Sequence, residues 1–131
     1  MITGVDHVVV AVKDLDAAVG RYEDIFGTKV SDRSENAAAG MAMAFFRFDD
    51  SYVELVSNLG ETGPIHQRLE QRGEGVHIVA MKVDDLEKTV ADLREKGVRL
   101  VGDPGPGQPI RGQVFVHPTV TGGVLTQLVQ R

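Results

Sequence analysis

The stretch HVVVAVKDLD, from His7 to Asp16, decides the fold, because a related stretch, IVAMKVDDLE, returns at Ile78 to Glu87. The two copies lie 71 residues apart. Each begins with a short run of β-branched and apolar residues, which is typical of a strand buried on both faces. Each then reaches aspartates (Asp14 in the first copy, Asp84 and Asp85 in the second) at the place where a helix prefers a capping side chain. An internal repeat of this kind predicts two copies of one structural module.

The sequence that follows each copy extends the repeat. Apolar residues recur at helical spacing from Leu15 to Phe26 and from Leu86 to Leu93, and Gly27 and Gly97 are typical helix-ending residues. Extended segments are predicted at 29–31, 41–48 and 51–57 in the first half, and at 99–101, 113–117 and 124–129 in the second. The predicted fold class is therefore α+β, with two tandem βαβββ modules.

The remaining segments predict how the modules are joined. We expect one domain over residues 1–131, with module 1 at about 1–60 and module 2 at about 75–131. Pro64 favours the first turn of a linking helix over about 64–72. The stretch 102–112 contains three prolines and is long enough to form a lid or a binding loop.

Composition excludes several classes of protein. The net charge of −5 argues against a nucleic-acid-binding protein, which normally carries a basic surface. The absence of cysteine excludes disulfides, thiolate metal sites and a cysteine nucleophile. The longest apolar run, 41–46, is far shorter than a membrane span, and no secretory signal is visible. We therefore expect a cytoplasmic protein with neither a nucleic-acid nor a membrane partner.

Two βαβββ modules that open with Asp6-His7 and close with Gly122-Gly123-Val124-Leu125 resemble the vicinal oxygen chelate superfamily. Glyoxalase I, extradiol dioxygenases, fosfomycin-resistance proteins and bleomycin-binding proteins belong to it. Within this group the chain is most similar to the methylmalonyl-CoA epimerase family. The matching stretches are 6–12, 53–55, 57–64, 73–77, 83–86, 117–118 and 122–125. The resemblance implies glyoxalase-like, curved half-barrel sheets that pair to form a cup around one divalent metal.

The resemblance also implies four metal-ligand positions, which fall on His7, Glu54, Ile78 and Gln127. An amide oxygen such as that of Gln127 can bind a cation, but the hydrocarbon side chain of Ile78 has no lone pair to offer. His77 is the neighbour of Ile78, and its side chain needs a bulge to reach the same face of the strand. The implied metal set is thus reduced to His7, Glu54 and Gln127. We expect either no cofactor or a weakly held divalent ion (Co, Mn, Ni or Zn).

A second difference from the epimerases concerns the catalytic groups. Epimerisation beside a thioester carbonyl needs a base on each face of the carbon, yet the strand region 36–46 contains no titratable side chain. We therefore expect a small-molecule isomerase, lyase or cyclase in which His7 and Glu54 carry out the acid–base chemistry. Two alternatives remain open. One is a metal-dependent methylmalonyl-CoA epimerase, and the other is a non-catalytic protein that sequesters a ligand or an antibiotic.

The expected substrate is a small hydrophobic or acyl molecule. Alternate residues of an apolar strand, among them Met41, Met43 and Phe45, should face the cup and line a hydrophobic pocket. Gln127 would orient the substrate. Arg111 and His117 lie in the region where the resemblance places an acyl-CoA. We also expect a homodimer, because short modules leave sheet edges that a second copy can cover.

Overall fold

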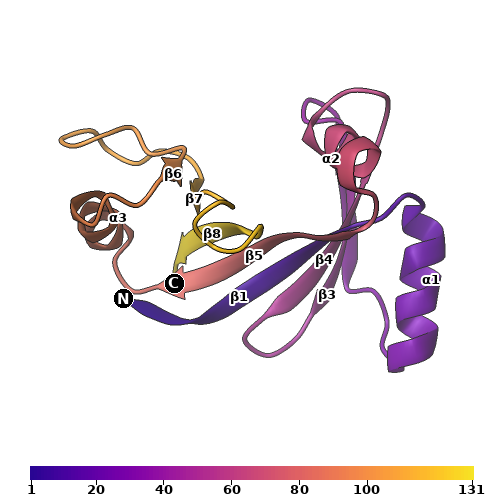
Figure 1. Ribbon diagram of the computed structural model, residues 1–131. Helices are drawn as coiled ribbons and strands as arrows, with labels where there is room; N and C mark the ends of the chain where they lie inside the picture. The colour runs from indigo at the N-terminus through magenta and orange to yellow at the C-terminus, as the bar shows by residue number, and fades with distance from the viewer. The chain divides into compact units, whose positions relative to one another are not determined.

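The computed structural model describes all 131 residues as eight strands and three helices (Figure 1). In chain order these are β1 (Ile2–Ala11), α1 (Leu15–Phe26), β2 (Asp32–Asn36), β3 (Met41–Arg47), β4 (Tyr52–Asn58), α2 (Pro64–Arg72), β5 (Gly75–Val83), α3 (Leu86–Glu95), β6 (Leu100–Val101), β7 (Val114–Val116) and β8 (Leu125–Gln130). The order β-α-β-β-β occurs twice, with α2 between the two copies. The α+β fold class and the two tandem modules are therefore confirmed.

The chain divides into two compact units. One unit is His7–His77, and the other combines Met1–Asp6 with Ile78–Arg131. The predicted linking helix α2 therefore belongs to the first of them. None of the helices is long and apolar enough to cross a membrane.

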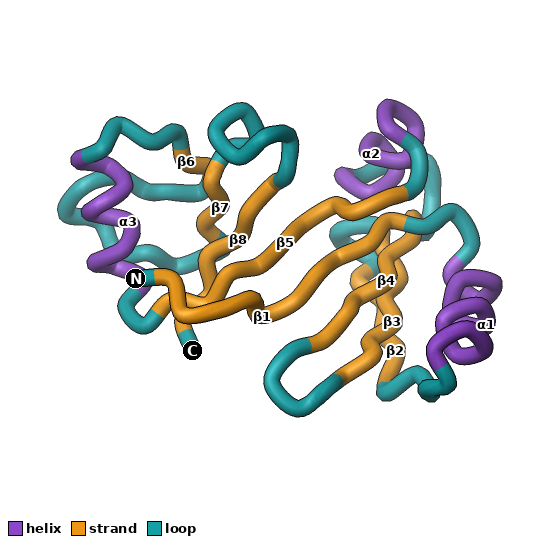
Figure 2. The backbone as a smooth tube through the Cα atoms, turned by 60° about the horizontal axis from the view of Figure 1, so that its bottom comes forward, coloured by secondary structure: helices purple, strands orange, loops and turns teal.

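In the His7–His77 unit, hydrogen bonds order the strands β2-β3-β4-β1, with β1 parallel to β4 (Figure 2). Every second residue of β3 (Ala42, Ala44 and Phe46) is buried. These side chains join one apolar cluster with Leu15 and Val19 from α1. Helix α1 therefore covers one face of this sheet, and the intervening residues of β3 lie on the other face.

The Ile78–Arg131 unit repeats this plan. Its strands follow the order β5-β8-β7-β6, with β5 parallel to β8. The apolar core contains strand residues such as Val83 and Val114 together with Val90 of α3. Val9 pairs with Glu54 in the first unit, and Ala80 pairs with Gln127 in the second. Glu54 and Gln127 consequently occupy equivalent positions in the two sheets.

Aspartate caps begin both module helices, as the sequence predicts. The Asp14 carboxylate accepts a hydrogen bond from the Ala17 amide at 3.1 Å, which satisfies a backbone donor that the helix leaves unpaired. In the second module Asp85 does the same for the Lys88 amide at 3.1 Å. The adjacent Asp84 instead accepts a hydrogen bond from the N-terminal ammonium group of Met1.

The second strand of the first module is displaced from its predicted position. The extended segment was expected at 29–31, whereas the hydrogen-bonded strand is β2, at Asp32–Asn36. The cause is the length of β3. Its residues from Met41 to Phe45 pair with β2, so that Met41 lies opposite Asn36 and Phe45 lies opposite Asp32. All five residues of β2 are exposed, so no apolar alternation announces this strand in the sequence.

Candidate functional site

The candidate site of the His7–His77 unit lies on the sheet face opposite α1. Glu54 pairs with Phe45 on one side and with Val9 on the other, and His7 pairs with Tyr52. Because side chains alternate between faces, His7, Tyr52, Glu54 and Phe45 share this face. Met41 and Met43 of β3 lie on this face as well. The side chains of Met41, Met43 and Phe45 are all partly buried. Their role in binding substrate remains a prediction.

An aromatic row crosses this face. The His7 and Tyr52 rings are stacked, with their centroids 4.4 Å apart and their planes 9° apart. The Phe45 ring lies 5.8 Å from that of Tyr52. The Arg47 guanidinium carbon lies 4.8 Å from the Phe45 centroid and 5.1 Å from the Tyr52 centroid, within the range of cation–π attraction. His7 itself is only 6% exposed.

Asp32 holds Arg47 over the aromatic rings. The Asp32 carboxylate accepts hydrogen bonds from Arg47 Nε at 2.8 Å and from Arg47 Nη2 at 3.2 Å. The same contact lowers the pKa of the Asp32 carboxyl group. Asp32, Arg47 and Tyr52 are not among the site residues that the sequence predicts. The signal for Arg47 was present, because it follows Phe45 by two residues and therefore lies on the same face of β3.

Glu54 is a partly buried carboxylate on the same face. Burial raises the pKa of the Glu54 carboxyl group, and the positive charge of Arg47 opposes that rise only in part. No protein group donates a hydrogen bond to this carboxylate. Such a group has the chemistry of a proton acceptor, because desolvation increases its affinity for a proton without a fixed partner to occupy it.

The equivalent place in the Ile78–Arg131 unit has different chemistry. Gln127 is partly buried and pairs with Phe115 and with Ala80, and alternation puts Ile78 on the same face. This face lies opposite the apolar core that α3 covers. The side chains here are an amide and a hydrocarbon, and neither can exchange a proton at neutral pH.

The residues present do not fit the divalent metal that the resemblance implies. No three His, Cys, Asp or Glu side chains are grouped so that they could hold an ion. Ile78 offers no electron pair. His77 does not compensate for it, because the positive charges of Arg68 and Arg72 lie near its ring and would oppose a cation there. Together with burial, these charges lower the pKa of His77.

Arg111 and His117 lie in loops of the Ile78–Arg131 unit. Arg111 is exposed and lines a cavity of about 360 Å³ together with residues of the 102–112 loop. His117 shapes a turn, because its Nδ1 accepts a hydrogen bond from the Thr119 amide at 3.1 Å and lies 2.8 Å from the Thr119 hydroxyl oxygen. The predicted role of both residues in substrate binding remains a prediction.

The apolar cavity of the His7–His77 unit lies on the side of α1. Its volume is about 350 Å³, and it is lined by Tyr22, Phe26, Thr28, Phe46, Phe48 and Val53. Phe46 and Val53 are directly paired across β3 and β4, on the face opposite to Phe45 and Glu54. This cavity is therefore separate from the face that bears the candidate acid–base residues.

The sequence of residues 6–115 matches the Glyoxalase/Bleomycin resistance protein/Dioxygenase superfamily. The match covers most of the chain and includes both module helices, in agreement with the repeated βαβββ order. The chain therefore belongs to this superfamily.

Comparison with individual proteins adds a narrower similarity. The chain is 34% identical over 130 residues to the mitochondrial methylmalonyl-CoA epimerase of Mus musculus, a match that covers 95% of this chain and 71% of the mouse protein. The crystal structure of methylmalonyl-CoA epimerase from Mycobacterium tuberculosis superposes with a TM-score of 0.81 at 35% identity, covering 98% of this chain and 88% of that one.

A further solved structure carries a bound molecule. It is a variant of Streptomyces coelicolor methylmalonyl-CoA epimerase in complex with 2-nitronate-propionyl-CoA. It matches with a TM-score of 0.82 at 33% identity, over 99% of this chain and 98% of that one. The resemblance to methylmalonyl-CoA epimerases that the sequence motifs indicate is thereby confirmed.

Proposed function

We propose that this protein is an isomerase that removes and returns a proton on the carbon beside the carbonyl group of a small acyl substrate. Glu54 is the proton acceptor. The observation that carries the proposal is the state of this carboxylate, which is partly buried beside aromatic and apolar side chains and has no hydrogen-bond partner. The similarity to methylmalonyl-CoA epimerases supports an acyl thioester as the substrate.

The reaction requires no change of oxidation state. The Glu54 carboxylate takes the proton from the carbon, and the electron pair of the C–H bond moves into the carbonyl group to form an enolate. A proton then adds to the opposite face of the carbon, and the enolate electrons return to the new C–H bond. The substrate leaves with inverted configuration, and Glu54 loses its proton to complete the cycle.

His7 is the candidate for the second proton-carrying group. Its position beside Tyr52 makes it a diagonal neighbour of Glu54 on two paired strands, so both can face one substrate. An imidazole ring carries two nitrogens that can donate and accept hydrogen bonds, so His7 can supply a proton in the return step. Stacking on Tyr52 fixes the plane of the His7 ring and supports a defined direction of proton transfer.

A metal-dependent methylmalonyl-CoA epimerase is the second candidate function, favoured by the similarity to that family. A divalent ion would withdraw charge from the enolate oxygen. The donor set argues against it, because the side chain of Ile78, at one of the implied ligand positions, has no lone pair with which to bind a cation. Non-catalytic sequestration of a ligand is the alternative if no substrate turns over.

The experiment measures epimerisation of methylmalonyl-CoA by chelator-treated protein. Glu54→Gln should lower kcat by about one hundredfold or more, the usual contribution of a general base, while the circular dichroism spectrum stays unchanged. Glu35→Gln is the matched control, because Glu35 is exposed on β2 and alternation puts it on the face of α1. Equal turnover by Glu54→Gln and wild type would contradict the proposal.

Metal analysis separates the two candidate functions. Elemental analysis after exposure to Mn, Co, Ni and Zn should find no stoichiometric ion in the wild type. About one ion per chain that disappears in His7→Ala would instead support the metal-dependent epimerase. A protein that binds an acyl ligand tightly, turns over no substrate and is indifferent to Glu54→Gln would be a sequestering protein.

A further inference from the structure

Arg47 is a cation on the same sheet face as the proposed base, and the mechanism above gives it no role. Strands β1 to β4 contain two lysine or arginine side chains, Arg33 and Arg47. Arg33 pairs with Ala44, whose side chain is buried on the α1 side of the sheet. Alternation along β3 puts Arg47 on the other face. Arg47 is therefore the only lysine or arginine of these four strands on the Glu54 face.

Two kinds of contact fix the position of the Arg47 guanidinium. The Asp32 carboxylate accepts hydrogen bonds from Nε at 2.8 Å and from Nη2 at 3.2 Å. The guanidinium carbon also lies 4.8 Å from the centroid of the Phe45 ring and 5.1 Å from that of the Tyr52 ring. A guanidinium carries more N–H donors than one carboxylate takes up. The donors that Asp32 does not use can therefore bind a further acceptor.

Arg47 lies beside Glu54 without contacting it. Glu54 pairs with Phe45 and Arg47 pairs with Tyr52, so the two charged residues are diagonal neighbours on β3 and β4. Diagonal neighbours are about 7–8 Å apart at their backbones, which is within the reach of long side chains. Burial raises the pKa of Glu54, and the nearby charge of Arg47 partly opposes that rise. The base and the cation are thus close enough to act on neighbouring atoms of one substrate.

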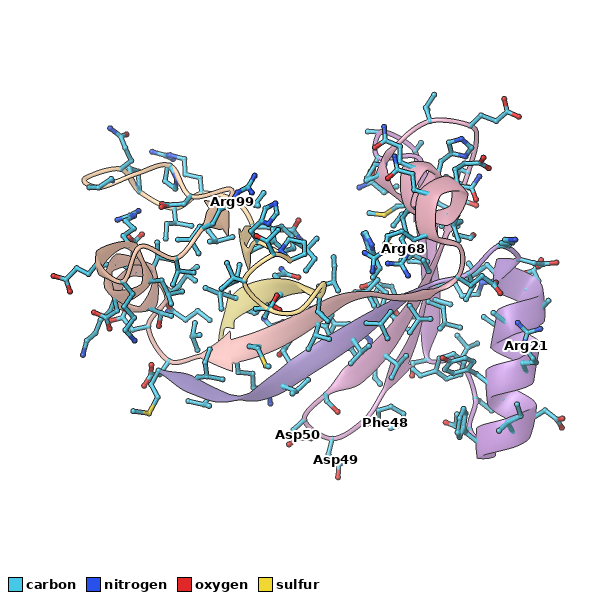
Figure 3. The ribbon with its side chains drawn as sticks, viewed as in Figure 1. Arg21, Phe48, Asp49, Asp50, Arg68 and Arg99 are labelled. Carbon is cyan, nitrogen blue, oxygen red and sulfur yellow. The ribbon has the colours of Figure 1, made fainter.

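The Arg47 end of β3 is open to solvent. The Arg47 side chain is 50% exposed and that of Asp32 is 47% exposed. Arg47 is the last residue of β3, and the exposed hairpin residues Phe48, Asp49 and Asp50 follow it at the tip of the strand pair (Figure 3). The guanidinium is therefore accessible to a ligand that lies on this face.

The proposed reaction needs a group that stabilises negative charge. Removal of a proton beside a carbonyl group moves negative charge onto the carbonyl oxygen, and fixed donors aimed at such an oxygen are among the largest contributions to catalysis. The residues paired with Glu54 are Phe45 and Val9, and their hydrocarbon side chains offer no donor. The Arg47 guanidinium is charged and already held in place, so it requires little rearrangement to bind the oxygen.

We propose that Arg47 is a catalytic residue that donates a hydrogen bond to the enolate oxygen while Glu54 holds the abstracted proton. The inference rests on the proposed function, because it names the group that stabilises the negative charge formed in that reaction. Asp32 is a positioning residue, which acts through Arg47 by fixing the direction of the guanidinium. The stabilisation that a divalent ion would supply is thereby assigned to a side chain.

Turnover of methylmalonyl-CoA by chelator-treated variants tests the role of Arg47. Arg47→Gln should lower kcat by about one hundredfold or more, the usual loss when a donor to an oxyanion is removed. Arg47→Lys should recover part of this loss, because it keeps the charge but not the planar fork. Arg33→Gln is the matched control and should leave kcat unchanged, since it removes an arginine–aspartate ion pair on the opposite face of the same sheet. Equal kcat values for Arg47→Gln and the wild type would overturn the inference.

Binding of an enolate-like anion tests the same contact without turnover. In 2-nitronate-propionyl-CoA the carbon beside the thioester is planar and shares a delocalised negative charge, whereas propionyl-CoA is uncharged there. In isothermal titration calorimetry, Arg47→Gln should weaken binding of the nitronate by about tenfold or more. It should leave propionyl-CoA binding unchanged, which also shows that the fold is intact. Unchanged nitronate binding, or an equal loss for both ligands, would overturn the inference.

A double-mutant cycle tests whether Asp32 acts through Arg47. Asp32→Asn should lower kcat by a smaller factor than Arg47→Gln and change KM little. In the Arg47→Gln background it should have no further effect, because the group that it positions is already absent. The same loss of kcat from Asp32→Asn with and without Arg47 would contradict the positioning role.

The inference and the proposed function can fail separately. If Glu54→Gln slows turnover and Arg47→Gln does not, the role of Arg47 is wrong and the base is correctly assigned. If Arg47→Gln selectively weakens nitronate binding while Glu54→Gln turns over substrate like the wild type, Arg47 does bind the anion and only the assignment of Glu54 is wrong.

Discussion

Glu54 and Gln127 occupy equivalent positions in the two sheets but differ in what their side chains can do. Each pairs with a small apolar residue of the first strand in its module. A carboxylate can accept a proton, whereas an amide cannot exchange one at neutral pH. The acid–base chemistry of the two modules is consequently unequal, and we assign it to the first.

Removing the Glu54 charge should change the pH dependence of stability. Because burial raises the folded-state pKa of this carboxyl group above its ordinary value of 4.5, the free energy of unfolding should fall as the pH rises from about 4.5 through the folded-state pKa. Glu54→Gln should lack this decrease and be at least as stable as wild type at pH 8. Urea unfolding at pH 4.5 and pH 8 measures the free energy of unfolding of both proteins. The same change with pH in the wild type and in Glu54→Gln would contradict this expectation.

His7 and Glu54 were predictable as candidate residues, because the internal repeat and the resemblance select these positions. Arg68, Arg47 and Tyr52 were not predicted from the sequence. Arg68 occurs in a helix rich in charged residues, and such a pattern normally indicates a solvated surface. Only its burial, its contact with Gly75 and its unpaired Nη1 distinguish it from the exposed Arg72 on the same helix.

At the scale of elements, both module helices depend on an aspartate cap. Asp14→Ala and Asp85→Ala should each lower the free energy of unfolding by about 1 kcal/mol, because each leaves a backbone amide of the first helical turn without an acceptor. Chemical denaturation measures the loss. Asp24→Ala, at an exposed position near the end of α1, is the control and should be nearly neutral. Equal stability of all three variants would contradict the capping role.

The 102–112 loop is attached to α3 by a partly buried ion pair. Asp103 accepts a hydrogen bond from Arg94 Nε at 2.8 Å and another from the Gly105 amide at 3.0 Å. The Arg94 contact in particular lowers the pKa of Asp103 from 3.8 to about 2. The expectation of a lid or binding loop over these residues remains a prediction, but one end of the loop is fixed to a helix.

Asp103→Asn should destabilise the protein in a pH-dependent manner. The ion pair contributes above the ordinary pKa of 3.8, and its contribution disappears as the pH falls through about 2. We expect a loss of about 1 kcal/mol at pH 7 after allowance for solvent screening, and almost none below pH 2. Denaturant unfolding of the wild type and of Asp103→Asn at both pH values provides the test. If the two proteins differ in free energy of unfolding by the same amount at both pH values, the ion pair is not the cause.

At the scale of the whole molecule, the chain was predictable as two modules because its repeat preserves both the strand pattern and the helix caps. The bounds of β2 were less predictable, since an exposed edge strand has no apolar alternation. Edge strands of this kind offer unpaired backbone groups to a second copy. We expect a homodimer, which sedimentation velocity should detect as a species of about twice 14.2 kDa. A monomer at micromolar concentration would contradict this expectation.

In the proposed reaction, Glu54 removes a proton from an acyl substrate without help from a metal. The most direct test is the exchange of the C2 proton of methylmalonyl-CoA in deuterated water, followed by NMR in the presence of excess chelator. We expect rapid exchange with the wild type, and exchange about one hundredfold slower with Glu54→Gln. Exchange that stops when chelator is added and returns with Co²⁺, or that proceeds equally in Glu54→Gln, would contradict it.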